Sequence, residues 1–302
     1  MKKLLIFFIL ISTKTFAQDG CSDVYSYLLF DEKSGHVISE TRSEKVTYPA
    51  SLVKLMTLYL TFEAIEKGHL KADHVLHISA RGEEVSKINK INRLAIKEGD
   101  EITVREAIRA VIVKSFNEAA VTLAEAVAGN EWDFVRKMNE KAQELGMDNT
   151  SFRNASGLHD EGQYTTSYDL ARLVIAMRKN FLGYYHLFAL KDFTYHGAKY
   201  ETHNHVLVDY KGAEGMKTGF TNAAGFNLVS AANKNDQRII SVLLGCASAE
   251  KRDKFTKNLL NEGFADLEKH SHEKSGIKIT KGFNYSANRK EEDYEELDSQ
   301  MR

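Results

Sequence analysis

The sequence predicts a mixed α and β fold in which both ends of the chain supply strands to one antiparallel sheet. Alternating apolar residues near the N-terminus, and again after about residue 191, indicate strands. Between them, from Ser51 to about Asn180, apolar residues recur at helical spacing. Because strands at both ends enclose a helical middle, the economical arrangement is a single sheet with the helical segment as a subdomain beside it.

The individual elements follow from the same patterns, in chain order. Residues 24–40 have the pattern of two strands around a turn at 31–35. Four helices with an apolar stripe are then predicted, at 51–68, 103–114, 117–129 and 131–146. A further helix begins at about residue 165, where Thr166 and Asp169 suit an N-cap pairing of the capping-box kind. Three strands and a helix complete the series, at 214–221, 225–234, 237–245 and about 251–262.

The first 17 residues have the pattern of a secretory signal peptide. A basic start, MKK, precedes the apolar run LLIFFILI, and the small residue Ala17 follows. That run is too short to span a bilayer, and its flanks argue against a buried first strand. We therefore expect an exported protein of the periplasm or extracytoplasmic cell-wall space. Its parts would be a signal peptide at 1–17, a single domain at 18–268 and a polar, disordered tail at 269–302.

Composition narrows the class of function. A hydrophobic content of 43% and a charged content of 27% are ordinary for a soluble globular protein. Removing residues 1–17 takes three lysines and no acid from 41 basic and 42 acidic residues, which changes the net charge from −1 to −4. A net negative charge does not favour binding to nucleic acid. Cys21 and Cys246 are too few for a disulfide scaffold but suffice for one bridge in an exported protein.

The strongest chemical signal is Ser51 followed three residues later by Lys54, in the stretch YPASLVKLMT. Positions i and i+3 of a helix share a face, so these two side chains can touch. Pro49 fixes the backbone where the chain enters the helix, which places Ser51 near the positive end of the helix dipole. Burial among apolar neighbours lowers the pKa of a lysine, and a neutral amine can accept the serine proton. The pattern predicts an activated serine nucleophile.

The spacing alone is not decisive, because Ser-x-x-Lys also begins at Ser248, Ser271 and Ser275. An N-cap serine followed by a solvated lysine is the ordinary explanation of such a spacing. The surroundings of the other serines are polar, whereas Ser51 has proline before it and apolar residues around its lysine. The setting therefore favours Ser51.

Two further tripeptides strengthen this interpretation. Ser115–Asn117 lies between two predicted helices, where a hydroxyl and an amide can face a cleft. Lys217–Gly219 occurs once, in a predicted strand. Lys217 and Thr218 offer a cation and a hydroxyl to an anionic ligand, and Gly219 would let a substrate backbone approach a sheet edge closely. The three motifs, in this order on helix start, loop and strand, strengthen the prediction of an activated serine nucleophile.

These motifs resemble those of the low-molecular-mass penicillin-binding proteins, the serine-type D-alanyl-D-alanine carboxypeptidases of peptidase family S11. The resemblance covers about residues 23–266 and implies a β-lactamase/transpeptidase-like fold. In two places the chain departs from the family pattern. We expect no additional C-terminal β-domain or amphipathic membrane anchor, and Phe220 stands where some relatives carry histidine. The strings that carry the resemblance are YPASLVKLMT, VKSFNEAAVTLAEAVAG, TSFRNASGLHDEGQYTTSYDLARL and AEGMKTGFTNAAGFNLVSAA.

The resemblance also implies roles for four catalytic and polar residues. Ser51 would be the acylated nucleophile, and Lys54 would be its general base. Ser115 would relay a proton toward the leaving D-alanine, and Asn117 would hydrogen-bond the peptide of the substrate.

The substrate-binding residues implied in the same way lie on one strand. Lys217 and Thr218, with Gly219 beside them, would receive the terminal carboxylate. The backbone N–H groups of Ser51 and Phe220 would form an oxyanion hole. The implied partners are peptidoglycan stem peptides and, as inhibitors, β-lactam antibiotics; no cofactor is implied.

Several other residues invite a functional role that their sequence context does not support. Two histidine pairs, His74 with His77 and His203 with His205, lack a carboxylate or thiol at ligand spacing, so no metal is expected. Three single residues have ordinary explanations: Asn204 as a turn before a strand, Arg252 as a surface arginine or carboxylate ligand, and Trp132 as helix core.

Three functions remain open on the sequence. The first is removal of the terminal D-alanine from cell-wall peptides, and the second is endopeptidase cleavage of their cross-links. The third is a catalytically silent exported binding protein, although the intact motifs argue against it. A β-lactamase is a weaker variant, because the loop at 152–168 shows no clear pattern of a deacylating glutamate and offers Glu161 as its only candidate.

Two structural predictions accompany these functions. The implied fold makes the first and last strands antiparallel neighbours, so Cys21 and Cys246 should lie close enough for a disulfide. Residues 269–302 show no apolar stripe at helical spacing, so the mature protein should lack a membrane anchor of its own.

Overall fold

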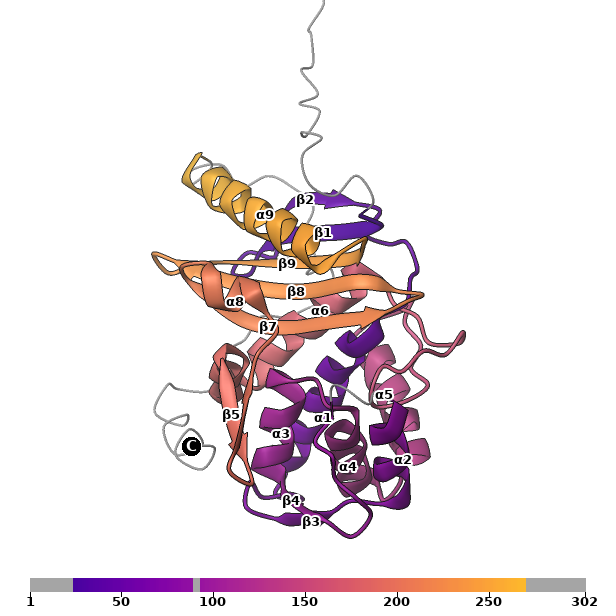
Figure 1. Ribbon diagram of the computed structural model, residues 1–302. Helices are drawn as coiled ribbons and strands as arrows, with labels where there is room; N and C mark the ends of the chain where they lie inside the picture. Colours follow the sequence, from indigo (N-terminus) through magenta and orange to yellow (C-terminus); the bar gives the residue numbers. More distant parts are fainter. Residues whose placement is uncertain (1–23, 89–92, 270–302) are drawn as a thin grey trace, which may run out of the picture.

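The computed structural model of the protein describes residues 24–88 and 93–269. Its centre is a five-stranded sheet in the order β2-β1-β9-β8-β7, in which every neighbouring pair is antiparallel. Strands from the two ends of the described chain lie side by side, as the indigo and orange arrows of Figure 1 show. The strands are β1 Ser26–Asp31, β2 Val37–Thr41, β7 Ala213–Thr221, β8 Gly225–Lys234 and β9 Gln237–Cys246.

Strand β1 joins the two ends of the chain. It pairs with β2 on one side and with β9 on the other, where Leu28 lies opposite Val242. Its side chains alternate between the two faces of the sheet. Leu28 and Phe30 enter the main core, whereas Leu29 packs with Leu260 of the last helix. The prediction of one antiparallel sheet built from both ends of the chain is confirmed.

Helices cover both faces of this sheet (Figure 1). Helix α9 (Ala249–Lys269) packs on one face against β1, β8 and β9, and α6 (Ser167–Asn180) packs against β1 and β9 on the other. The subdomain beyond α6 has α1 (Lys54–Glu66) at its centre, where every residue from Lys54 to Phe62 is buried. Around it lie α2 Ala80–Ile88, α3 Val104–Val113, α4 Asn117–Ala128 and α5 Glu131–Glu144.

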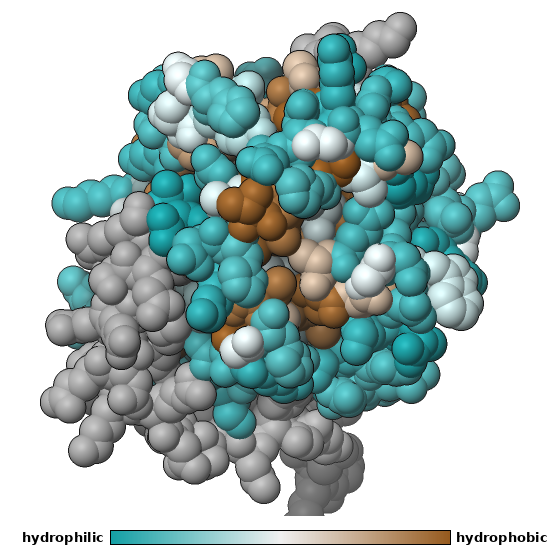
Figure 2. Space-filling model, turned by 90° about the horizontal axis from the view of Figure 1, so that it is seen from below, coloured by the Kyte–Doolittle hydropathy of each residue, from teal (hydrophilic) through white to brown (hydrophobic). Residues whose placement is uncertain are grey.

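Several short elements were not predicted from the sequence. Their three to five residues are too few to establish a period of apolar residues. They are the ribbon β3 Val75–His77 with β4 Glu101–Thr103, the hairpin β5 Asp192–Tyr195 with β6 Ala198–Glu201, and the turns α7 Leu182–Tyr185, η2 His186–Ala189 and α8 His205–Asp209. Seen from the β3–β4 end, the surface is mainly hydrophilic with apolar side chains gathered near its centre (Figure 2).

Two helix starts differ in detail from the prediction. The first predicted helix begins as a 3-10 turn, η1 (Ala50–Val53), before α1 takes over. At α6 the Thr166 hydroxyl accepts the N–H of Asp169 at 3.0 Å, as an N-cap should. The Asp169 carboxylate does not return that contact, because it accepts from Asn149 N and Thr150 Oγ1 instead. Thr166 therefore caps the helix, but Asp169 does not complete a capping box.

The prediction that Trp132 belongs to the helix core is wrong. Its side chain is 76% exposed. Helix α5 buries Phe134, Met138 and Ala142, which follow one another at intervals of four residues on one face. Trp132 lies off that stripe.

Parts of three predictions fall outside the described residues. Cys246 is fully buried and disulfide-bonded, but Cys21, its predicted partner, lies outside them. So do the predicted signal peptide and residues 270–302 of the predicted tail, whose first residue, Lys269, is the last of α9. Within 24–88 and 93–269, no helix combines the length and apolarity that a bilayer crossing requires.

Candidate active site

Ser51 lies in a tight turn that the sheet holds in place. Ala50, just before it, has a φ of 49°, a conformation that residues other than glycine rarely adopt. The buried amide of Asn227, on β8, donates hydrogen bonds of 3.1 Å each to the carbonyls of Tyr48 and Pro49. These contacts fix the backbone on the N-terminal side of the serine.

Two glycines allow other backbone segments to close on this turn. A Cβ on Gly157, whose φ is 80°, would lie 2.1 Å from the carbonyl oxygen of Ala50. A Cβ on Gly219 of β7 would lie 3.1 Å from the backbone nitrogen of Ser51. Gly219 therefore permits close packing of the Ser51 turn against β7, a reason additional to the substrate approach predicted from the sequence.

Lys54 lies one turn beyond the serine and is fully buried. Its Nζ donates to Ser51 Oγ at 3.1 Å, to Asn117 Oδ1 at 2.8 Å and to the carbonyl of Ser156. The contact between the serine and the lysine, predicted from their spacing, is present.

Burial lowers the pKa of Lys54 to about 7, against an opposing effect of the nearby Glu118 carboxylate. Glu118 is itself buried, which raises its pKa, and its Oε1 accepts the N–H of Leu94 at 2.6 Å. Near neutral pH, the Lys54 side chain is therefore a neutral amine in a substantial fraction of the molecules.

The three contacts of Lys54 orient that amine. A neutral amine has two N–H groups and one lone pair, and the Asn117 and Ser156 oxygens can only accept hydrogen bonds. Ser51 is the one partner of the three that can donate. When Lys54 is neutral, the lone pair is consequently left for the Ser51 hydroxyl, the geometry required of a general base.

Ser115 lies between α3 and α4 with a φ of 61°. Its side chain is buried, and its hydroxyl has no hydrogen-bond partner among the described residues. Asn117, two residues on, begins α4 and reaches Lys54. The predicted loop position of Ser115 is confirmed.

Lys217 and Thr218 lie on β7, in the predicted strand. Lys217 is 1% exposed, and its Nζ donates to the carbonyl of Thr218 at 2.9 Å. Burial, followed by the charges of Lys54 and Arg252, holds the pKa of Lys217 well below its usual value. A concentration of basic groups of this kind favours an anion close to Lys217.

His203 has a partner that the sequence did not suggest. Its Nε2 lies 2.9 Å from Oγ1 of Thr218. Burial, followed by the positive charge of Lys217, lowers the pKa of His203 to about 3, so the imidazole is neutral. A neutral imidazole can donate Nε2–H to Thr218 and leave the hydroxyl proton of Thr218 free for a ligand.

Three remaining candidates have structural positions of their own. Arg252 is buried at the start of α9 and paired with Asp253 at 2.7 Å, which excludes an exposed surface arginine. Asn204 caps the short helix α8 by accepting the N–H of Leu207 at 3.3 Å, rather than preceding a strand. Phe220 is 49% exposed and stacks on Phe226.

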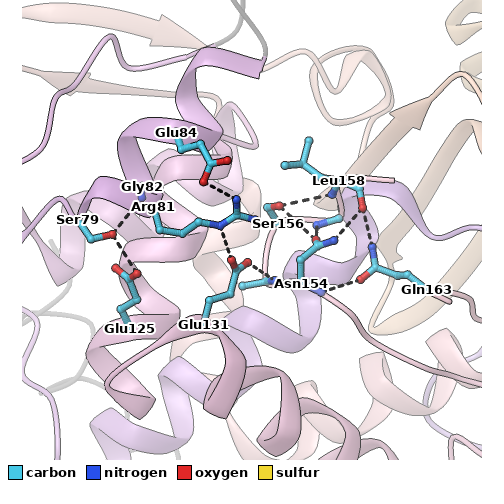
Figure 3. Close-up of polar contacts among 12 residues, drawn as sticks. Ser79, Arg81, Gly82, Glu84, Glu125, Glu131, Asn154, Ser156, Leu158 and Gln163 are labelled. Carbon is cyan, nitrogen blue, oxygen red and sulfur yellow. Dashed lines mark hydrogen bonds and ion pairs between the residues drawn. The ribbon is translucent and has the colours of Figure 1, made fainter. Parts of the chain in front are cut away.

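The loop that carries the Ser156 carbonyl is held by the network in Figure 3. The Asn154 side chain accepts the N–H of Gly157 at 2.7 Å and donates to the carbonyl of Leu158 at 2.9 Å. Glu131 of α5 accepts the N–H of Ala155 at 3.0 Å and pairs with Arg81 of α2 at 2.9 Å. The oxygen that orients Lys54 is thus fixed from two helices.

Comparison with protein families decides the classification. The model of the D-alanyl-D-alanine carboxypeptidases, peptidase family S11, matches residues 13–248, well over half of the chain. The chain belongs to the S11 D-alanyl-D-alanine carboxypeptidase family. The family resemblance stated from the motifs is confirmed.

Individual S11 relatives agree. D-alanyl-D-alanine carboxypeptidase DacF of Bacillus subtilis is 32% identical over 267 residues, which are 85% of this chain and 67% of the relative. DacD of Escherichia coli is 34% identical over 243 residues, 79% of this chain and 62% of the relative. The chain thus spans about two thirds of the length of these curated relatives.

Solved structures of the family share the fold. Penicillin-binding protein 5 of Haemophilus influenzae has a TM-score of 0.77 and 33% identity, over 80% of this chain and 71% of that one. Penicillin-binding protein D2 of Listeria monocytogenes, in its ampicillin-bound form, has a TM-score of 0.72 and 32% identity, over 80% of this chain and 97% of that one. The predicted β-lactamase/transpeptidase-like fold is confirmed.

Within this S11 site, four contributing residues were not found from the sequence: Asn227, Gly157, Glu118 and His203. Asn227 holds the Ser51 turn, Gly157 lets the Ser156 loop pack against that turn, and Glu118 opposes the lowering of the Lys54 pKa. No sequence motif marks these three residues. His203 was noticed only as half of a histidine pair considered for a metal. The contact of His203 with Thr218 gives it a different role, in the carboxylate-binding part of the predicted site.

We predict that His203→Leu lowers kcat/KM for a D-alanyl-D-alanine peptide about tenfold, since Thr218 would lose the partner that orients it. His203→Gln, which keeps an N–H donor, should recover much of the loss. Because the pKa of His203 is about 3, the loss should be the same at pH 6 and pH 8. Exposed His205→Leu is the control. Unchanged kinetics in His203→Leu, or a Gln variant as poor as the Leu variant, would contradict this role.

Proposed function

We propose that the chain is a serine D,D-carboxypeptidase that removes the terminal D-alanine from peptidoglycan pentapeptides through an acyl-enzyme on Ser51. The observation that carries the proposal is the contact of buried Lys54 with Ser51, Asn117 and the Ser156 carbonyl. The acting unit would be the domain at 18–268, exported to the extracytoplasmic cell wall. Family membership supports both the activity and the location.

Acylation would begin with the terminal carboxylate of the substrate at Lys217 and Thr218. The neutral amine of Lys54 takes the proton of Ser51 Oγ while the oxygen attacks the carbonyl carbon of the scissile D-Ala–D-Ala bond. Negative charge develops on the carbonyl oxygen, and the backbone N–H groups of Ser51 and Phe220 donate hydrogen bonds to that oxygen. The Ser51 turn and β7 are close enough for this, as the approach at Gly219 indicates.

Collapse of this intermediate would break the C–N bond and leave an ester on Ser51. The proton held by Lys54 passes through the Ser115 hydroxyl to the nitrogen of the leaving D-alanine. That hydroxyl has no competing partner among the described residues, which supports the relay. With Lys54 neutral again, a water molecule can be deprotonated and attack the ester, which releases the shortened peptide and restores Ser51.

A β-lactam should enter the same site, since the related Listeria protein is known in an ampicillin-bound form. We propose that penicillin acylates Ser51 and leaves slowly. Among the described residues, no carboxylate hydrogen-bonds Ser51 or Lys54.

The test combines mass spectrometry with product analysis. Penicillin should add one acyl group per chain, on the peptide that contains Ser51, and a pentapeptide should yield free D-alanine. An adduct on Ser115, on Ser248 or on no serine would contradict the proposal. Cleavage of a cross-linked dimer without release of D-alanine from the pentapeptide would instead identify an endopeptidase.

A further inference from the structure

The β5–β6 hairpin presents an aromatic face to the helical subdomain. Side chains of a strand alternate between its two faces. On β5, Phe193 and Tyr195 are buried, whereas Asp192 and Thr194 are exposed. Tyr200 of β6 lies opposite Phe193 and is half-buried. Strand β5 packs beside α3 (Figure 1), so the buried face of the hairpin lies close to the segment that follows this helix.

Phe116, the middle residue of the segment between α3 and α4, packs against this face. Its side chain is 1% exposed, and its ring meets that of Tyr200 edge to face, with 5.4 Å between the ring centroids. The Phe193 ring lies 6.3 Å from that of Phe116 and stacks on Tyr200 at 5.1 Å. We call Phe116, Phe193 and Tyr200 the hairpin cluster. Aromatic pairs at such distances attract one another beyond the effect of burial, so the cluster fixes the position of the Phe116 ring.

Ser115 depends on its neighbours for its position. Its φ of 61° is one that residues other than glycine rarely adopt, and such a backbone persists only where the surrounding structure imposes it. The N–H groups of Ser115 and Phe116 donate to the carbonyls of Val111 and Ala110, at 3.1 and 3.3 Å. The Ser115 hydroxyl has no hydrogen-bond partner among the described residues. The side chain that anchors this turn is therefore that of Phe116.

Asn117 is held in a different way. It is the first residue of α4, and its Oδ1 accepts a hydrogen bond from Lys54 at 2.8 Å. Both of these constraints remain when the Phe116 ring is free to move. A loosened hairpin cluster should consequently displace Ser115 more than Asn117.

We propose that Phe116, Phe193 and Tyr200 are positioning residues, which hold the Ser115 hydroxyl where it relays the proton to the leaving group. The inference rests on the proposed function, because Ser115 has this task only in that reaction. Proton transfer requires the hydroxyl within hydrogen-bond reach of the leaving nitrogen. A small displacement of Ser115 should therefore slow the chemical step much more than it weakens binding.

The test is a double-mutant cycle on acylation by penicillin, with Tyr200→Leu and Ser115→Ala. Tyr200→Leu removes the ring that meets Phe116 and should lower the limiting rate constant of acylation about tenfold, a part of the roughly 10²- to 10⁴-fold contribution of an acid–base group. The dissociation constant of the initial complex should change by less than about twofold. Tyr200→Phe, which keeps the ring, should react at the normal rate. In Ser115→Ala, which reacts slowly, adding Tyr200→Leu should have little further effect.

Tyr27→Leu is the matched control. Tyr27 is also half-buried, and its ring meets that of Phe255 edge to face at the same centroid distance of 5.4 Å. This pair lies on the face of the sheet that α9 covers, away from the hairpin. Tyr27→Leu should lower the unfolding temperature about as much as Tyr200→Leu does and leave acylation unchanged. If Tyr200→Leu does not fold, Phe193→Leu makes the same test.

Three results would overturn the positioning role alone. They are an unchanged acylation rate in Tyr200→Leu, a Tyr200→Phe variant as slow as the Leu variant, and a full tenfold effect of Tyr200→Leu that persists in Ser115→Ala. If penicillin leaves no adduct on Ser51 of the unaltered protein, the proposed function fails and this inference with it.

Discussion

Replacing Ser51 with alanine should abolish the penicillin adduct and D-alanine release together. Only the serine oxygen can form the acyl bond, so turnover should fall by roughly 10⁴- to 10⁶-fold. The fold should survive, because the anchors of the turn are backbone carbonyls held by Asn227 and not the serine side chain. Intact-protein mass, D-alanine release and thermal unfolding measure these three outcomes.

Ser248→Ala is the matched control, since Ser248 has the same spacing to a lysine. Its Oγ accepts the N–H of Lys251 at 3.2 Å, which is the behaviour of an N-cap serine. This variant should keep full activity and one adduct per chain. Residual acylation of Ser51→Ala at any other serine would show that the nucleophile has been assigned to the wrong residue.

Replacing Lys54 with methionine should slow acylation by about 10²- to 10⁴-fold, the usual contribution of a general base. Methionine fills a similar apolar space without an amine. The measurement is the second-order rate of penicillin acylation at fixed pH. A Lys54→Met rate within a few-fold of the unaltered protein would exclude Lys54 as the base.

The pH dependence of acylation provides an independent check. The amine must be neutral to accept the Ser51 proton, and the pKa of Lys54 is lowered to about 7 by burial. The rate should therefore be low below pH 6, rise through about 7 and level off above 8. An ordinary lysine would place that rise near 10.4. In Lys54→Met the limb near 7 should be missing, although the remaining slow reaction is still measurable.

The sequence was sufficient where the relevant contact is local. The serine and lysine lie one turn apart, so the spacing predicted a contact that the structure contains at 3.1 Å. Strand β8 has the predicted bounds. A run of mostly apolar and small residues begins at Gly225 and ends at the charged Lys234. The order of the motifs on helix start, loop and strand was predicted for the same reason.

Contacts between distant segments could not be predicted in this way. Asn227 reaches the carbonyls before Ser51 from a strand about 180 residues further along the chain. His203 meets Thr218 only because the segment before α8 returns to the edge of β7. Trp132 looked like core because it is large and apolar, yet the phase of the stripe on α5 leaves it outside. Only the fold decides which of these residues meet.

The order of strands in the sheet also constrains how the chain can reach this structure. Ser26 of β1 pairs with Leu244 of β9, so the central ladder joins segments separated by nearly the whole described chain. Closing so long a loop is slow and entropically unfavourable. A growing chain that has not yet reached β7 has only β1 and β2 of this sheet, and an isolated two-stranded ribbon is marginally stable at best. Until β7 has formed, the turn that carries Ser51 would also lack its close packing against Gly219. Catalytic competence should therefore appear late in refolding, together with protection of the β1 and β9 amides from hydrogen exchange.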